Sequence, residues 1–318
     1  MTTPAPKVSF GMPVYNGENY IDQALDSVLN QTFTDFEVII SDNASSDKTE
    51  EICRRFAEKD ARIKYHRNEE NVGAAPNYNR TFELSSGEYF NWFAHDDLLD
   101  PHYLEECVKI LDNNPDTVLC SSVVRIIDEN SEELTIYRPG LEATESESAP
   151  HKRFVPMTLI HHVCTDIFGL FRADILGQTG LHGIYHGCDR ALLAEIALMG
   201  KIQRVKEPMF SNREHNARYT RATDATERAH WHATVESKEI GFFTWKLYSE
   251  YLTAVGKRVP GFADKIRCYG VLGRWWFVNW NMLRMMTDVV TYVIPSAFTV
   301  AEKIKNAITK PQHPQVDR

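Results

Sequence analysis

The sequence predicts an α/β fold in which a mainly parallel sheet is flanked by helices. Three short runs have the length of strands: the apolar Val8 to Val14, the buried-strand pattern Phe36 to Ser41, and the shorter Ile63 to His66. Each run is followed by polar residues and then by a segment with apolar residues at helical spacing, such as Ile21 to Leu29. Strands that alternate with helices form βαβ units, whose right-handed crossovers make neighbouring strands parallel.

The composition is that of an ordinary globular protein. Of 318 residues, 43% are hydrophobic and 25% are charged, which excludes disorder throughout the chain. No charged and apolar leader opens the sequence, so we expect a cytoplasmic protein, free or at the inner face of the cell membrane. The six cysteines are far apart and form no Cys-x-x-Cys pair, which predicts reduced thiols rather than a disulfide framework.

The net charge of −9 is unevenly distributed along the chain. From residue 257 onward ten Lys and Arg stand against four Asp and Glu, whereas residues 1–256 carry 25 against 40. An acidic main body excludes a general nucleic-acid binder, because affinity for a phosphate backbone depends on clustered positive charge.

The fourth predicted strand, Glu88 to Ala94, ends in His95, Asp96 and Asp97. Adjacent carboxylates at the end of a core strand repel each other and lose solvation, so a divalent cation would explain them. Hard oxygen ligands of this kind suit Mg²⁺ or Mn²⁺. The alternative is that the two aspartates cap the helix that follows, because Asp is a favoured N-cap residue.

Polar residues also follow the first and second strands, at Asn16 and Asp42. Because the carboxyl ends of parallel strands meet at one edge of a sheet, we expect these residues and Asp96 to line a ligand cleft. Asp42 can accept a hydrogen bond from a ring N–H or a ribose hydroxyl, or it can cap the next helix. The chain has neither a Gly-x-Gly-x-x-Gly turn after the first strand nor a P-loop, so a nucleotide would be held differently.

The second half of the chain continues the pattern less regularly. The acidic stretch between Glu132 and Pro150 predicts a surface loop. The remaining elements predicted here are a helix at Tyr103 to Leu111, strands at Val118 to Ile127, Thr165 to Phe171 and Ile202 to Val205, and a helix opened by Gly187 that runs through Met199.

Four groups of residues together resemble the nucleotide-sugar half of family 2 glycosyltransferases, which have the Rossmann-like GT-A fold and act with inversion. In chain order these groups are Pro13-Val14-Tyr15-Asn16, then Asp42 to Asp47, then Asn71 and Gly73 with Asn79, and finally His95-Asp96-Asp97. The resemblance implies that the first two groups hold the base and ribose. It further implies that Asn79 and Arg80 border the nucleotide pocket.

The resemblance also implies a metal and diphosphate site at Asp96 and Asp97. Ala94 occupies the first acidic position of the family's usual Asp-x-Asp, so the metal, Mn²⁺ or Mg²⁺, would depend more on diphosphate oxygens. His215 resembles a family histidine near the metal, and neutral imidazole can complete a metal shell. Arg213 or Arg218 can stabilise the charge that develops on the departing nucleotide.

Inverting transfer needs a base that removes the acceptor proton. Asp189, at a predicted helix start, matches the position where the family usually shows Glu-Asp, although Cys188 replaces the Glu. A simple helix cap is the alternative for Asp189, and Asp166 is a competing carboxylate. His182, His186 and Cys188 have the residue types of a zinc site but no fourth ligand at diagnostic spacing.

We expect a catalytic domain at residues 1–225 and a helical C-terminal region at 226–318. Between Tyr269 and Ile294 a helical pattern carries one polar stripe among tryptophans and aliphatic residues. Charges interrupt its apolar face too often for a spanning helix. Residues 270–310 therefore either lie in a membrane interface or pack against the catalytic domain or a second subunit, as in a homo-oligomer.

Together these patterns predict an inverting, metal-dependent glycosyltransferase. Its donor would be a nucleotide-diphosphate sugar and its acceptor a saccharide or lipid-linked saccharide, in cell-surface polysaccharide or glycan synthesis. Because Ala94 and Cys188 depart from the family pattern, a non-catalytic nucleotide-sugar-binding protein or membrane scaffold is the alternative. A nucleotidyltransferase fits less well, because the turn after the first strand lacks a glycine-rich basic loop.

Overall fold

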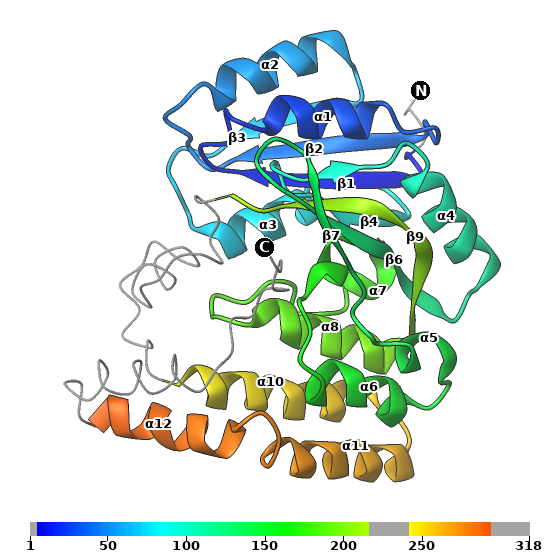
Figure 1. The fold of residues 1–318 in the computed structure, drawn as a ribbon, viewed down its shortest axis with the longest axis vertical. Coiled ribbons are helices and arrows are strands. Elements are labelled where there is room, and N and C mark those ends of the chain that lie inside the picture. The colour runs from blue at the N-terminus through cyan, green and yellow to red at the C-terminus, as the bar shows by residue number, and fades with distance from the viewer. Residues whose placement is uncertain (1–4, 216–241, 294–318) are drawn as a thin grey trace. The chain divides into compact units, whose positions relative to one another are not determined.

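The structure is a computed structural model that describes residues 5–215 and 242–293. These residues form two compact units, each assembled from segments that are distant in the chain (Figure 1). Of the described residues, the first unit contains 5–138, 165–184 and 202–215, and the second contains 139–164, 185–201 and 242–293. The domain boundary expected at residue 225 lies outside the described residues, and the compact units divide the chain at other points.

The sheet of the first unit begins with four parallel strands, as predicted. Their spatial order is β3-β2-β1-β4. Phe10 and Met12 of β1 and Val38 and Ile40 of β2 are fully buried, so this half of the sheet forms the core. The four strands are β1 (Val8–Val14), β2 (Phe36–Asp42), β3 (Ile63–Arg67) and β4 (Tyr89–Trp92).

The other half of the sheet is antiparallel, so the prediction of a mainly parallel sheet holds only for the first four strands. Beyond β4 the order continues β8-β6-β9-β5, and β7 pairs with the outer part of β6. The turn between β6 and β7 is too short for the crossover that parallel strands need. The strands concerned are β5 (Leu98–Leu99), β6 (Thr117–Ile127), β7 (Glu133–Tyr137), β8 (Leu170–Arg172) and β9 (Lys201–Arg213).

Helices cover both faces of the parallel half. Figure 1 shows α1 and α2 on one face and α3 on the other. α1 buries an apolar stripe of Ile21, Ala24, Leu25 and Val28, which is the spacing that predicted it. The helices of this unit are α1 (Ile21–Leu29), α2 (Thr49–Lys59), α3 (Ala74–Glu83), α4 (Tyr103–Asn113) and the short α7 (Ala173–Leu176).

Two predicted segments differ in the structure. The acidic stretch expected to be a loop contains β7 and the short helix α5 (Ala143–Ser146), because Arg125 of β6 holds Glu133 of β7 in a 2.9 Å ion pair and Thr144 is buried. The strand expected at Thr165 to Phe171 begins instead with a 3₁₀ turn over Thr165–Phe168, and only Leu170–Arg172 is extended.

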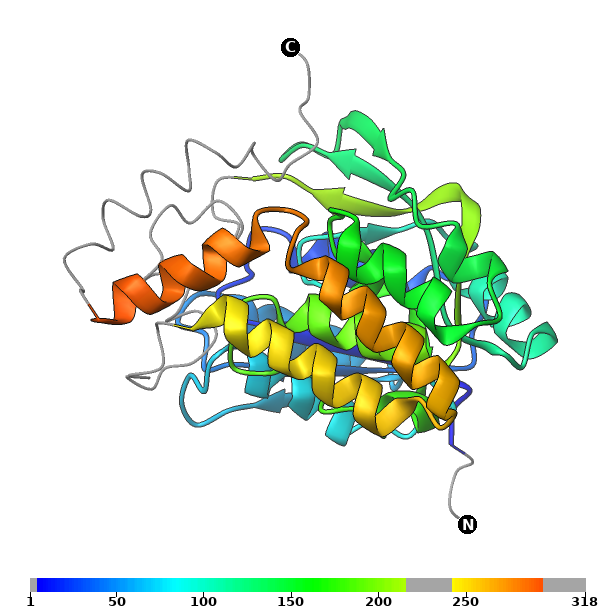
Figure 2. The ribbon, with the colours of Figure 1, turned by 90° about the horizontal axis from the view of Figure 1, so that it is seen from below.

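In its described residues, the second unit is built of helices joined by loops. α6 packs against α8 and α11, and α10 packs against α8, α11 and α12, an arrangement seen from below in Figure 2. Fully buried Tyr251 of α10 lies edge-on to Trp275 of α11, with ring centroids 6.2 Å apart. These helices are α6 (Pro150–Leu159), α8 (Cys188–Met199), α10 (Phe243–Arg258), α11 (Phe262–Trp275) and α12 (Asn281–Val293).

The helical pattern predicted between Tyr269 and Ile294 is not one helix. α11 ends at Trp275 and α12 begins at Asn281, because Asn279 and Trp280 have φ angles of 53° and 58° that cannot continue a right-handed helix. The polar stripe is therefore divided between two helices. Within the described parts of the chain, none of the helices combines the length and apolar character needed to cross a bilayer.

Gly11 of β1 lies where α3 and β4 approach each other closely. A Cβ atom at this position would overlap the Thr81 side chain and lie 2.5 Å from Cζ of Phe90. We expect Gly11→Ala to lower the free energy of unfolding by about 1–3 kcal/mol, because the packed core must shift. Gly180→Ala is the control, since its Cβ would meet nothing within 4 Å. Equal urea midpoints for the two variants would contradict this account.

Candidate functional site

The carboxyl ends of the parallel strands bring three loops together. Val14 of β1 is in register with Asp42 of β2, and Asp42 is in register with Arg67 of β3. The loops that follow these strands therefore start side by side at one edge of the sheet. Pro13 lacks the backbone N–H that a strand residue normally donates to its neighbour. It is tolerated inside β1 because the pairing of β1 with β4 ends at Gly11, so no carbonyl of β4 needs this donor.

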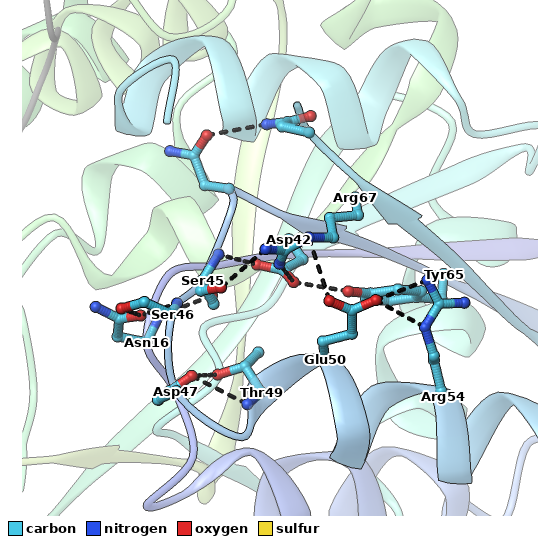
Figure 3. Close-up of polar contacts among 12 residues, drawn as sticks. Asn16, Asp42, Ser45, Ser46, Asp47, Thr49, Glu50, Arg54, Tyr65 and Arg67 are labelled. Carbon is cyan, nitrogen blue, oxygen red and sulfur yellow. Dashed lines mark hydrogen bonds and ion pairs between the residues drawn. The ribbon is translucent and has the colours of Figure 1, made fainter. Parts of the chain in front are cut away.

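The first two loops are joined by hydrogen bonds (Figure 3). The Asn16 N–H donates to Ser45 Oγ at 2.9 Å, and the Ser46 N–H donates to Asn16 Oδ1 at 2.9 Å. Asn16 and Ala44 both have positive φ angles, of 51° and 59°. Tyr15 remains 47% exposed beside this junction, so its ring can stack on a flat ligand.

Asp42 is fully buried and its carboxylate is held by three donors. It accepts hydrogen bonds from the Ser45 N–H at 2.9 Å, Tyr65 Oη at 2.6 Å and Arg67 Nη1 at 2.8 Å (Figure 3). Burial, followed by the bond to Asp42, raises the pKa of Tyr65. A carboxylate has about four lone-pair sites, so Asp42 keeps room for about one more donor.

Sequence reasoning missed Tyr65 and Arg67. Arg67 also donates to the Ser45 carbonyl at 3.0 Å and pairs with Glu50 at 3.3 Å, so it links β3 to the loop after β2 and to α2. Side chains alternate between the two faces of a strand, so Tyr65 and Arg67, two residues apart, point to the same face. This spacing, beside a strand that ends in Asp42, was the signal available in the sequence.

A cluster of asparagine side chains shapes the third loop. Asn43 Nδ2 donates to Asn71 Oδ1 at 2.8 Å, and Asn71 Oδ1 also accepts from the Gly73 N–H at 2.9 Å. Asn43 Oδ1 accepts from Asn68 Nδ2 at 2.9 Å. Gly73 has a φ of 87°, which favours glycine. Asn71 and Gly73, both predicted to bind the nucleotide, therefore set the path of this loop.

Asn79 and Arg80 lie on α3 beside the same loop. The Asn79 side chain exchanges two hydrogen bonds of 2.9 Å with the backbone of His182, and Arg80 Nη1 donates to Asn68 Oδ1 at 2.6 Å. Both border a cavity of ≈ 450 Å³. The cavity is lined by Asn68, Val72, Pro76, Asn79, Arg80, Glu83, His182, Gly183 and Ile184.

Beyond β4 the structure brings Asp96 and His215 together, 119 residues apart in the chain. Asp96 Oδ2 and His215 Nε2 are 2.9 Å apart, and the two side chains are 14% and 12% exposed. The His215 ring also lies against Tyr20, with centroids 5.0 Å apart. His95, the residue before Asp96, lies against Gly17, where a Cβ would come within 2.6 Å of the imidazole.

Asp97 points elsewhere than Asp96 and is almost completely buried, at 1% exposure. Its carboxylate accepts from Asn212 Nδ2 at 3.1 and 3.2 Å and from the Arg213 N–H at 2.8 Å. Among the residues that the structure describes, no three His, Cys, Asp or Glu side chains gather as a metal cluster. Asp97 therefore anchors the end of β4 to β9.

Arg213 is fully buried, and all three of its guanidinium nitrogens donate to protein acceptors. Nε donates to the Asp96 carbonyl at 2.8 Å, Nη1 to Ser131 Oγ at 2.9 Å and Nη2 to Gln23 Oε1 at 2.9 Å. The guanidinium also lies 4.6 Å from the centre of the Tyr20 ring. Through the bond to the Asp96 carbonyl, Arg213 positions the backbone of Asp96. Arg218, the other predicted arginine, lies outside the described residues.

Asp189 lies in the second unit, in the first turn of α8. It is partly buried, and its Oδ1 accepts from the Arg190 N–H at 2.7 Å. Asp166, the competing carboxylate, is unsuitable as a base because it is 2% exposed and held by Arg204 Nε at 3.0 Å, Arg204 Nη2 at 2.6 Å and Ser121 Oγ at 2.6 Å. Asp189 thus stays the predicted base.

The mixed α/β sheet, with polar side chains beyond the carboxyl ends of its parallel strands, fits the predicted GT-A fold. Residues 9–180 match the model of a family described as glycosyl transferase family 2. Because this match spans more than half of the 318 residues, the chain belongs to glycosyl transferase family 2.

The similar proteins are consistent with this family. An uncharacterized glycosyltransferase of Rickettsia typhi is 36% identical over 166 residues, which cover 51% of this chain and 50% of the relative. One of Methanocaldococcus jannaschii is 37% identical over 136 residues, covering 42% and 47%. The chain thus spans about half the length of these relatives.

Two solved structures confirm the predicted GT-A fold class. S. aureus TarS in complex with UDP has a TM-score of 0.59 and 16% identity, over 86% of this chain and 72% of TarS. The mannosyltransferase PcManGT from Pyrobaculum calidifontis, in complex with GDP-Man and Mn²⁺, has a TM-score of 0.52 and 18% identity, over 98% of this chain and 83% of that protein.

If Arg213 acts by positioning Asp96, Arg213→Lys should lower the free energy of unfolding by about 2–4 kcal/mol, because a lysine cannot satisfy these buried acceptors. Urea denaturation measures this loss. Arg125→Lys is the control, since Arg125 is partly exposed and its loss should cost less than about 1 kcal/mol. Unchanged stability combined with weaker nucleotide binding would instead indicate that Arg213 contacts the donor directly.

Proposed function

We propose that this protein is an inverting glycosyltransferase that moves a sugar from a nucleotide-diphosphate sugar to a saccharide or lipid-linked acceptor. Family membership supports transfer of a sugar. The observation that carries the proposal is the Asp96–His215 pair, which joins the ends of β4 and β9 at the edge where the three loops also meet. A glycan or cell-surface polysaccharide is the proposed product class.

The nucleoside end of the donor would lie over the loops after β1, β2 and β3. Tyr15 offers an exposed ring for the base. Asp42 is fully buried, so its remaining acceptor site would reach a base N–H or a ribose hydroxyl only after its surroundings open. Asn16, Asn71 and Gly73 would act by fixing the loop backbones. This framework exists before any ligand binds, so binding would need little ordering of the loops apart from the surroundings of Asp42.

Asp96 and His215 would hold a divalent cation, Mn²⁺ or Mg²⁺. Their donor atoms are 2.9 Å apart, close to the ~3.0 Å between neighbouring ligands of an octahedral ion with bonds of about 2.1 Å. The carboxylate suits Mg²⁺ or Mn²⁺, and the imidazole adds a nitrogen donor of the kind that transition metals accept. When bound, the cation would supply positive charge to the leaving diphosphate. Asp97, the third predicted ligand, would first have to exchange its bonds to Asn212.

Asp189 is proposed to take the acceptor proton as the bond to the sugar forms. Asp189 lies in the first turn of α8 and is only partly buried, so an acceptor hydroxyl could approach its carboxylate. The neighbouring Cys188 is buried and cannot take this role from it.

Loss of the Asp96–His215 pair should weaken metal binding. We expect Asp96→Asn and His215→Gln each to reduce the apparent affinity for Mn²⁺ at least tenfold, measured as the Mn²⁺-dependent thermal shift in the presence of a nucleoside diphosphate. His102→Gln is the control, because His102 is exposed and pairs only with neighbouring surface groups in the described structure. An unchanged Mn²⁺ response in both site variants would rule out this cation site.

Transfer itself is tested by screening nucleotide-diphosphate sugars for release of the nucleotide. At least one donor should be consumed, and Asp189→Asn should lower kcat by about 10²–10⁴-fold while nucleotide binding survives, because only the proton acceptor is lost.

The control for this variant is Asp174→Asn, an exposed carboxylate in the first turn of α7. Normal turnover by Asp189→Asn would remove Asp189 from the role of base. Binding of a nucleotide sugar by the unmodified protein without any release would favour the alternative, a non-catalytic nucleotide-sugar-binding protein.

A further inference from the structure

α12 buries polar side chains beside Met285 and leaves most of its apolar side chains exposed, which is unusual for a helix at the surface of a globular protein. Its polar side chains face the neighbouring helices: Asn281 is 4% exposed and donates to the Trp275 carbonyl at 2.8 Å. Asp288 accepts from the Thr244 N–H of α10 at 2.8 Å. Burial and the charge of Arg190 lower the pKa of Arg284, which is also partly buried.

The outer side of α12 is apolar. Met282, Met286, Val289, Val290 and Val293 are between 40% and 69% exposed. These residues follow one another at intervals of one, three and four positions, so they form a single stripe along the helix. A stripe of this kind normally faces a protein core, and here it faces away from one.

α11 continues the apolar surface beyond the bend. Phe262, Ile266 and Phe277 are 79%, 55% and 81% exposed, while Cys268 and Leu272 on the opposite side are buried. Trp280, in the bend between the helices, is 64% exposed. α11 and α12 both lie along α10 in Figures 1 and 2, and their buried sides face it. We call the exposed apolar residues of both helices the α11–α12 surface.

The charge around this surface favours a negatively charged partner. Arg267 and Arg274 are exposed and lie seven residues apart on α11, at the border of its apolar stripe. Arg267 forms one exposed ion pair, with Asp264 at 3.0 Å. The described residues 257–293 contain six Lys and Arg against two Asp and Glu, in contrast to 25 against 40 for residues 1–256. Two copies of this surface facing each other would bring like charges together, so self-association is disfavoured.

Aromatic residues, methionine and bordering arginines are the composition of helices that lie in a membrane interface. The 13 described residues of α12 span about 20 Å, less than the hydrocarbon core of about 30 Å. We propose that the α11–α12 surface binds the interface of an anionic lipid bilayer, with both helices lying in the membrane plane. This binding is independent of the donor chemistry.

The test is co-sedimentation of the full chain with vesicles of phosphatidylcholine alone or with 30% phosphatidylglycerol. The protein should sediment with the anionic vesicles, and less so at high salt. Met286→Glu combined with Val290→Glu should weaken this binding at least tenfold, because it places charges on the apolar stripe. Arg267→Gln combined with Arg274→Gln should weaken it about fivefold per arginine.

Leu84→Glu combined with Leu134→Glu is the matched control, since these leucines are 37% and 38% exposed in the first unit. Its vesicle binding should be unchanged, and circular dichroism should confirm that every variant is folded. Failure of the unmodified protein to bind anionic vesicles, or equal binding by the Met286 and Val290 variant, would overturn the proposal. Light scattering tests self-association without lipid. A dimer of the unmodified protein that is absent in the Met286 and Val290 variant would overturn the membrane proposal in favour of self-association.

Discussion

Burying a guanidinium is tolerated where its nitrogens find acceptors, and all three guanidinium nitrogens of the fully buried Arg213 donate to protein oxygens in the candidate site. It joins the residues after β4, the turn after β6 and the start of α1. Asp97 adds the bonds to Asn212 and to the Arg213 backbone. Because β9 is fixed in this way, His215, two residues beyond Arg213, comes within 2.9 Å of Asp96.

The donor edge of the sheet is organised on the same principle. Its three loops are joined by hydrogen bonds between side chains and backbone, from Asn16 to Ser45 and from Asn43 to Asn71. Asp42 is held by Tyr65 and Arg67 from the neighbouring strand. A site whose polar groups already have partners is rigid. Such a site favours ligands that match its remaining donors and acceptors without rearrangement of the protein.

Periodicity predicted the parallel half of the sheet because β1 and β2 are buried on both sides, and because β1, β2 and β3 are each followed by an amphipathic helix. It could not predict the antiparallel half, where β5 has two residues and β8 three. The Asp96–His215 contact was expected only through resemblance to a family, since nothing local links residues 119 positions apart. The opposite orientations of Asp96 and Asp97, and the bend at Asn279, depend on packing that a residue pattern does not contain.

Arg213 donates to the main-chain carbonyls of Asp96, Asp128 and Glu129 as well as to side chains. Every amino acid supplies such a carbonyl, so substitutions at positions 128 and 129 can accumulate without disturbing these bonds. In an evolutionary comparison, Arg213 and these two neighbours would therefore show little covariation despite direct contact. Methods that infer proximity from correlated substitutions would miss these hydrogen bonds from Arg213 to the main chain, although they stabilise the candidate site.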